Sequence, residues 1–409
     1  MSSQDLVPHL FRTEYSNIVG VLIKHFGLEN IDVAEDIASE TFLAALESWR
    51  FNGLPNAPTA WLYTVAKNKA RNHLVRAKIM YETSPDVLEK IATTIDLSHE
   101  NISDSQLRMI FVVCHPSIPL ESQIGLALRI LCGFGIGEIA DAFLTTKDTI
   151  NKRLFRAKEA LRNNNVSLEV PGEEEMERRL TSVLTTIYLL FSEGYYSESQ
   201  PEVLREDLCQ ESIRLTELLM GYEATCRPET LALLALTCFH SSRFLARRNE
   251  SGEMVLYADQ DESLWDQSLI SRGVELLHQA STGHVLTKFH LEASIAYWHC
   301  QKEDTSEKWE SVLYLHNLLL QIEYSPIAAL NRTYALAKVK GNEVAIIEAE
   351  KLQLTTNQYY YMLLGELYKD TDPNQAKANL SMALSLAKTD FDKQTIKHKL
   401  DNLQVRKNQ

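Results

Sequence analysis

A basic segment of helix length, residues 59–78, combines side chains that suit single-stranded nucleic acid. It holds five Lys or Arg residues and no acid, in a chain with 55 acidic and 41 basic residues. At about 100° per residue, its apolar side chains share one face, and Trp61, Asn68 and Asn72 share the opposite face. Aromatic stacking, amide hydrogen bonds and flanking cations are the chemistry that unpaired bases require. The alternative is a solvated basic face, but a large exposed aromatic ring favours a binding surface.

The preceding segment, residues 32–49, is predicted to be an acidic amphipathic helix. Asp32 is a good N-cap, and apolar side chains recur at helical spacing along one face. The other face carries acidic residues around a single leucine, Leu43: Asp32, Asp36, Glu40 and Glu47. An apolar anchor inside a charged surface favours a docking surface for another protein. One exposed leucine is also common on surfaces that bind nothing.

Residues 137–162 carry a second nucleic-acid pattern. The spacing predicts a short helix over 137–143, a turn at 144–146 and a second helix over 147–162, which fits a helix-turn-helix. The second helix has a tight apolar stripe, and its other side carries Thr149, Lys152, Arg153 and Arg156. This layout is typical of a recognition helix that reads a major groove and its phosphates. The alternative is a basic amphipathic helix inside a bundle.

The remainder of the chain, residues 166–409, is predicted to be an acidic array of helices. It holds 24 basic and 36 acidic residues, and so carries most of the net charge of −14. Two weak repeats fit the tetratricopeptide spacing, with matches at Leu330, Tyr334, Ala345, Ala349, Leu364, Gly365, Tyr368, Ala376, Leu380 and Ala383. Stacked helix pairs are the favoured interpretation, and an irregular helical bundle is the alternative.

Composition narrows the possible classes of protein. With only 15 Gly and 11 Pro, the sequence predicts an all-α fold. It has no apolar run that could span a bilayer and no signal-peptide pattern, so we expect a cytoplasmic protein. The six cysteines form no CxxC pair and have no metal-ligand spacing with histidine, so buried thiols and no metal site are expected. Because no phosphate loop, HExxH motif or nucleophile elbow is present, we expect neither an enzyme nor a cofactor.

Taken in their order along the chain, these segments resemble an extracytoplasmic-function (ECF) sigma factor of bacterial RNA polymerase. "DVAEDIASETFLAALESW" resembles the region that grips the polymerase clamp, and "PTAWLYTVAKNKARNHLVRAK" resembles the region that melts and reads the −10 element. "EIADAFLTTKDTINKRLFRAKEALR" resembles the −35 reader. "LLFSEGY", "DLCQESIRL", "DQDESLWD" and "ALNR" resemble the tetratricopeptide-like extension of one ECF subgroup, which is thought to regulate the sigma factor in place of an anti-sigma protein.

The resemblance implies a domain order and three sets of contacts. The domains are sigma region 2 at 1–80, a linker at 81–102, the region 4 helix-turn-helix at 103–165 and the regulatory extension at 166–409. Core polymerase would contact Asp32, Glu35, Asp36, Ser39, Glu40, Leu43 and Glu47. The −10 DNA would contact Asn52, Asn56, Trp61, Lys67, Asn68, Lys69, Arg71, Asn72, Arg76 and Lys78. The −35 DNA would contact Lys147, Thr149, Lys152, Arg153 and Arg156.

The expected function is therefore transcription initiation with core RNA polymerase and promoter DNA as partners. The extension would respond to a protein or small-molecule signal, and no membrane is involved. A one-component helix-turn-helix regulator with a ligand-sensing repeat domain is the alternative, and it leaves the acidic helix and Trp61 without a role. Binding to core polymerase separates the two functions.

Overall fold

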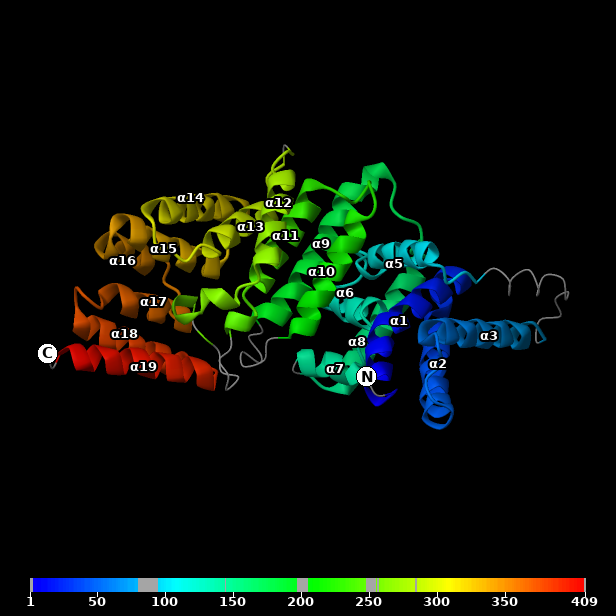
Figure 1. Ribbon diagram of the computed structural model, residues 1–409. Helices are drawn as coiled ribbons and strands as arrows, with labels where there is room; N and C mark the ends of the chain where they lie inside the picture. The colour runs from blue at the N-terminus through cyan, green and yellow to red at the C-terminus, as the bar shows by residue number, and fades with distance from the viewer. Residues whose placement is uncertain are drawn as a thin grey trace. The chain divides into compact units, whose positions relative to one another are not determined.

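The computed structural model describes residues 3–79, 95–143, 145–196, 205–247, 255, 257–283 and 285–407. All regular structure in these residues is helical (Figure 1), which confirms the all-α prediction. The chain divides into two compact units, Met1–Glu193 and Gly194–Gln409. No helix in the described part of the chain is both long and apolar enough to cross a membrane.

Three long helices open the first unit: α1 (Ser3–Phe26), α2 (Ile31–Asn52) and α3 (Pro58–Ile79). Helix α1 packs against both others, and its buried stripe includes Tyr15, Ile18 and Leu22. Gly27 (φ 88°) precedes the short 3₁₀ turn that leads into α2, and Gly53 (φ 77°) directly follows α2; both have the positive φ that favours glycine. The predicted helices at 32–49 and 59–78 lie within α2 and α3.

The second half of this unit contains α5 (His99–Val113), α6 (Leu120–Leu126), the π-helical segment η2 (Ala127–Leu131), α7 (Ile136–Ala142) and α8 (Lys147–Asn163). Helix α8 packs on α6 and α7 through the predicted apolar stripe, Ile150, Leu154, Ala157 and Leu161. Thr146 caps α8 by accepting from the Thr149 amide at 3.2 Å. Because α5 packs on α1, both predicted sigma domains belong to one compact unit.

Helix α9 (Glu173–Tyr196) lies across the division between the units. Its first half is bound to the first unit, since the Arg179 guanidinium donates to the Phe111 carbonyl at 2.7 Å. Thr186 donates to the Gln123 side chain at 2.9 Å, and Ser182 donates to the Cys114 carbonyl at 3.0 Å. The division therefore falls inside α9, later than the boundary expected after residue 165. Helix α5 begins inside the expected 81–102 linker, of which residues 81–94 lie outside the described part.

The second unit is a succession of helices in which each packs mainly on the next. In chain order they are α10 (Glu206–Met220), α11 (Pro228–Ser241), α12 (Gln267–Ala280), α13 (Lys288–His299), α14 (Ser306–Ile322), α15 (Pro326–Lys340), α16 (Asn342–Lys351), α17 (Gln358–Tyr368), α18 (Pro373–Leu386) and α19 (Asp390–Lys407). Figure 1 shows α17, α18 and α19 side by side, in orange to red. The 3₁₀ turns η3 (Leu245–Arg247), η4 (Tyr257–Asp259) and η5 (Glu262–Leu264) lie between α11 and α12.

The two helix pairs expected from the repeats are present as α15–α16 and α17–α18. A Cβ added to Gly365 would lie 2.6 Å from the Leu380 side chain, so α17 and α18 approach too closely for any larger residue at this position. Ala376 and Ala383 on α18 are fully buried, as are Ala345 and Ala349 on α16. The assignment of these pairs to the tetratricopeptide class stays a prediction.

The cysteines are all free. Cys114, Cys132, Cys209 and Cys238 are buried, which agrees with the expected buried thiols, and burial raises the pKa of Cys238 to about 11. Cys300 is half-buried, and Cys226 is exposed because it lies in the turn between α10 and α11.

Candidate functional site

The acidic face of α2 is exposed over most of the predicted set. Asp36, Ser39, Glu40 and Glu47 are all exposed, and the Leu43 side chain between them is 55% exposed. Leu46 and Phe51 extend the apolar area and are 52% and 82% exposed. They follow Leu43 at helical spacing, which is the sequence signal that could have identified them. The surface can therefore bury apolar area while acids surround it.

Glu35 lies elsewhere, although the resemblance implied that core polymerase would contact it. Its side chain is 9% exposed, and its carboxylate accepts from Arg129 Nε at 2.6 Å. Lys158 on α8 also donates to it, and the Tyr15 hydroxyl lies at 3.4 Å. Arg129 belongs to η2, so segments far apart in the sequence cover this end of α2. No local pattern could have indicated that burial.

Asp32, at the start of α2, is exposed but already has partners within the chain. Lys158 Nζ lies 2.8 Å from one carboxylate oxygen, and Arg162 Nη2 lies 2.6 Å from the other. Partial burial pulls the pKa of Asp32 upward, but hydrogen bonds from Lys158 and Arg162 outweigh this effect and hold the pKa below its usual value. Asp32 is therefore charged at neutral pH and engaged by α8.

The basic helix α3 presents most of its predicted residues to solvent. Asn68, Arg71, Asn72 and Arg76 are exposed, as are Asn52 and Asn56 in the segment before the helix. Lys67 and Lys69 are half-buried, and the side chain of Lys78 lies outside the described residues. Lys69 forms an ion pair with Glu40 on α2 at 2.9 Å. The cationic face of α3 and the acidic face of α2 are therefore adjacent.

Trp61 is half-buried, whereas the sequence predicted an exposed ring. Its indole packs edge-to-face on the buried Trp49 of α2, with ring centroids 5.4 Å apart and an interplanar angle of 62°. Such a pair stabilises the contact between the helices and fixes the orientation of the outer ring. Trp61 thus has a structural role, and the solvent-facing part of its ring remains free to stack.

On α8, four of the predicted contact residues are exposed: Lys147, Thr149, Lys152 and Arg156. Arg153 differs from the prediction, because its side chain is turned towards α6. It pairs with Glu121 at 2.9 Å and lies over the Phe143 ring at 5.7 Å. Asn151 and Phe155 are exposed on the same helix and were not predicted. The exposed face is therefore rotated from the predicted one towards Asn151 and Phe155.

Several polar residues in the segments that resemble the ECF extension form contacts within the second unit itself. Asp261 and Asp266 accept from backbone amides at the starts of η5 and α12. Glu211 pairs with Arg214 at 2.8 Å, and Arg332 donates to Asn317 at 2.6 Å. These contacts give the five residues structural roles within the second unit.

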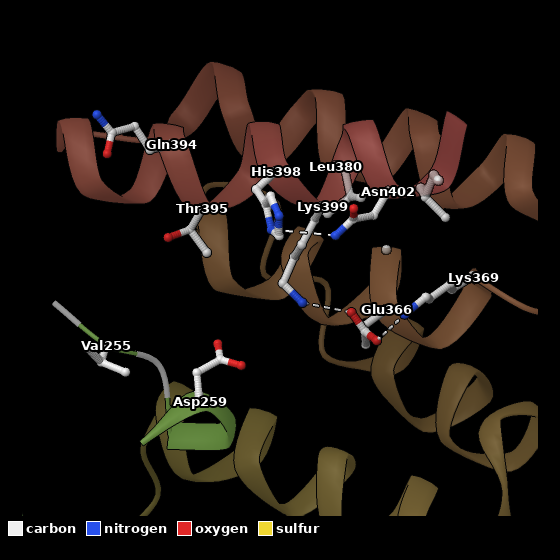
Figure 2. A pocket seen from close by; sticks show the side chains of 12 residues that line it. Val255, Asp259, Glu366, Lys369, Leu380, Gln394, Thr395, His398, Lys399 and Asn402 are labelled. Atoms are coloured by element: carbon white, nitrogen blue, oxygen red, sulfur yellow. Dashed lines mark hydrogen bonds and ion pairs between the residues drawn. The ribbon is translucent and has the colours of Figure 1, made fainter. Parts of the chain in front are cut away.

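A polar hollow of about 450 Å³ in the second unit lies between η4 and helices α17 to α19 (Figure 2). On one wall Glu366 pairs with both Lys369, at 3.2 Å, and Lys399, at 2.8 Å. Burial raises the pKa of Glu366, but the hydrogen bond and charge of Lys399 hold it below the usual value. Asp259 lies on the opposite wall. The hollow therefore carries both signs of charge.

Two family models match the chain. Residues 10–79, which include most of α1 and all of α2 and α3, match sigma-70 region 2. Residues 179–281, which begin within α9, match a family of unknown function, DUF6596. The region expected to be a tetratricopeptide-like extension thus begins with an uncharacterised family.

Curated relatives fall into two groups. An uncharacterized protein of Rhizobium meliloti is 32% identical over 94% of this chain and 93% of its own length. ECF RNA polymerase sigma-E factor of Salmonella typhimurium is 31% identical over 38% of this chain and 84% of its own length. RNA polymerase sigma-H factor of Pseudomonas aeruginosa is 29% identical over 35% of this chain and 78% of its own length. No solved structure matches the chain.

Replacing Trp61, the outer ring of the tryptophan pair, tests the packing between α2 and α3. Trp61→Ala should lower the free energy of unfolding by about 1–2 kcal/mol, because it removes both the ring pair and buried area. The matched variant Arg71→Ala alters an exposed cation on the same helix and should change stability by less than about 0.5 kcal/mol. Urea unfolding measures both values. Equal stability of the two variants would show that Trp61 and Trp49 are not packed in solution.

Proposed function

The chain belongs to the family of ECF RNA polymerase sigma factors, and from this premise we propose that it recruits bacterial core RNA polymerase to promoters. The proposal rests above all on the adjacent surfaces of α2 and α3. One surface is acidic with exposed apolar side chains at its centre, and the other is cationic with exposed amides. A docking surface for a protein next to a binding surface for unpaired bases is what this activity needs.

The proposed division of labour follows the helices. The exposed face of α2 binds core polymerase, and α3 with Asn52 and Asn56 holds the separated strand of the −10 element. Helices α7 and α8 act as a helix-turn-helix on the −35 element, in which Lys152 and Arg156 approach the DNA. The protein acts by binding and without catalysis of its own, in the cytoplasm where its partners are.

We further propose that the second unit regulates the first. The Rhizobium meliloti relative matches both units over nearly its whole length, which supports a shared architecture. Helix α9, whose last residues belong to the second unit, is bonded through Arg179 and Thr186 to α5 and α6 in the unit that contains the proposed −35 reader. The polar hollow beside Glu366 is a candidate site for a regulatory signal.

The core-binding proposal is tested by reversing the α2 surface. Asp36→Arg combined with Leu43→Ala should weaken binding to core polymerase about 30-fold or more, since it inverts a charge and removes the apolar anchor. Because both side chains are exposed, the free energy of unfolding should change little. Glu174→Arg makes an equal charge reversal at an exposed site on α9 and serves as the control. Titration with core enzyme and run-off transcription measure the effect, and unchanged binding by the α2 variant contradicts the proposal.

Two neighbouring arginines on α8 should behave differently. Arg156→Ala should lower affinity for promoter DNA by about 1–3 kcal/mol if the guanidinium contacts a base edge. Arg153→Ala should instead lower the free energy of unfolding by about 0.5–1 kcal/mol, because Arg153 contacts Glu121 and Phe143. Gel-shift assays with intact and scrambled −35 sites, together with thermal unfolding, separate the effects. A greater loss of DNA affinity in the Arg153 variant would reverse the assignment.

Removal of the second unit tests its regulatory role. A chain ending at Glu193 keeps the α9 contacts with Phe111 and Gln123, which a chain ending at residue 165 would lose. We expect several-fold weaker run-off transcription from the shortened chain, with DNA affinity little changed. Stronger and more salt-sensitive DNA binding would instead indicate that the acidic unit shields the cationic surfaces. No change in either measurement rules out regulation under those conditions.

A further inference from the structure

Helix α8 is tied to α2 by ion pairs on one side of the helix. Lys158 bonds both Asp32 and Glu35, and Arg162 bonds Asp32. The Lys158 side chain is only 11% exposed. These pairs connect residues more than 120 positions apart in the sequence, so they report tertiary packing and not local helix chemistry.

The contact has the character of a reversible interface. A hollow of about 400 Å³ lies between the helices, lined by Asp36 and Ser39 of α2 and by Asn151 and Phe155 of α8. Phe155 is 59% exposed at this edge. Charged pairs around a loosely packed gap are typical of contacts that form and break, and not of a continuous apolar core.

Of the two engaged carboxylates, Asp32 lies at the end of the exposed α2 face assigned above to core polymerase, and the buried Glu35 lies beside it. Asp32 has both carboxylate oxygens engaged, and Glu35 is buried beneath Lys158 and Arg129. A second protein cannot contact Glu35 while these cations cover it. Because Lys158 and Arg162 are on the same chain as Asp32 and Glu35, they compete with core polymerase for these carboxylates at a high effective concentration.

We propose that the Lys158 and Arg162 flank of α8 is an intramolecular competitor of core polymerase for the acidic end of α2. In this closed form the −35 helix masks part of the polymerase-binding face, and polymerase binds the fraction of molecules in which α8 has separated from α2. The apparent dissociation constant then equals the intrinsic constant divided by the fraction of molecules that is open. This inference rests on the proposed sigma-factor function.

Weakening the contact should therefore strengthen binding to polymerase. Arg162→Ala removes an exposed pair without leaving a buried charge, and it should tighten core binding about two- to fivefold. Lys158→Ala should tighten it about tenfold or more. Arg178→Ala deletes an exposed cation on α9 and should change nothing. The experiment is a titration of each full-length variant with fluorescently labelled core polymerase.

A second measurement observes the closed form without polymerase. Carboxylates are labelled with carbodiimide and an amine, then quantified by mass spectrometry. Asp36 should label at least about tenfold faster than Glu35 in the unaltered chain, and Glu35 labelling should rise several-fold in Lys158→Ala. Asp104, held by Lys24 and Arg108 elsewhere in the unit, should keep its rate if the variant is folded.

The outcomes separate this inference from the function on which it rests. If the unaltered chain binds polymerase and both variants bind equally or more weakly, the masking inference is wrong. Equal labelling of Glu35 and Asp36 in the unaltered chain overturns it as well. If no form of the chain binds polymerase, the proposed function fails, and the inference fails with it. Tighter binding by the variants, with slow Glu35 labelling before the change, supports both.

Discussion

The first unit depends on one buried carboxylate, that of Glu35. A charge removed from water costs several kcal/mol unless partners replace its hydration. Glu35 obtains such partners from Arg129 in η2 and Lys158 in α8, while Tyr15 of α1 lies beside them. Four segments therefore meet at this carboxylate. Arg129 reaches the carboxylate from η2 and Lys158 from α8, so the network specifies how α8 fits against α2 in the closed form.

Opposite charges are kept in neighbouring but separate places. The exposed acids lie on α2 and the exposed cations on α3, and the Lys69–Glu40 pair links the two helices. The acidic surface can attract a basic partner, and the cationic surface can attract an acidic one such as nucleic acid. The more acidic second unit contains a hollow in which Glu366 is balanced by two lysines. The surfaces of α2, α3 and the hollow beside Glu366 therefore differ in the sign of the charges that they carry.

Local sequence patterns were sufficient to predict many of the helices in this structure. The helices containing Asp36, Asn68 and Lys152 were predicted within a few residues of their ends, because amphipathic periodicity and capping are local properties. The burial of Glu35 and the sideways turn of Arg153 could not be predicted, since both depend on residues far away in the sequence. The boundary was expected after residue 165, yet α9 continues the first unit beyond it through hydrogen bonds that no sequence pattern records.

The Trp49–Trp61 pair also gives the molecule an optical property. Of the five tryptophans in the chain, these two are the ones within residues 1–193. The intrinsic fluorescence of that part therefore originates at the junction of α2 and α3, where one ring is buried and the other borders solvent. The emission of the first unit reports on the surface assigned to unpaired bases, and no added dye is needed to observe it.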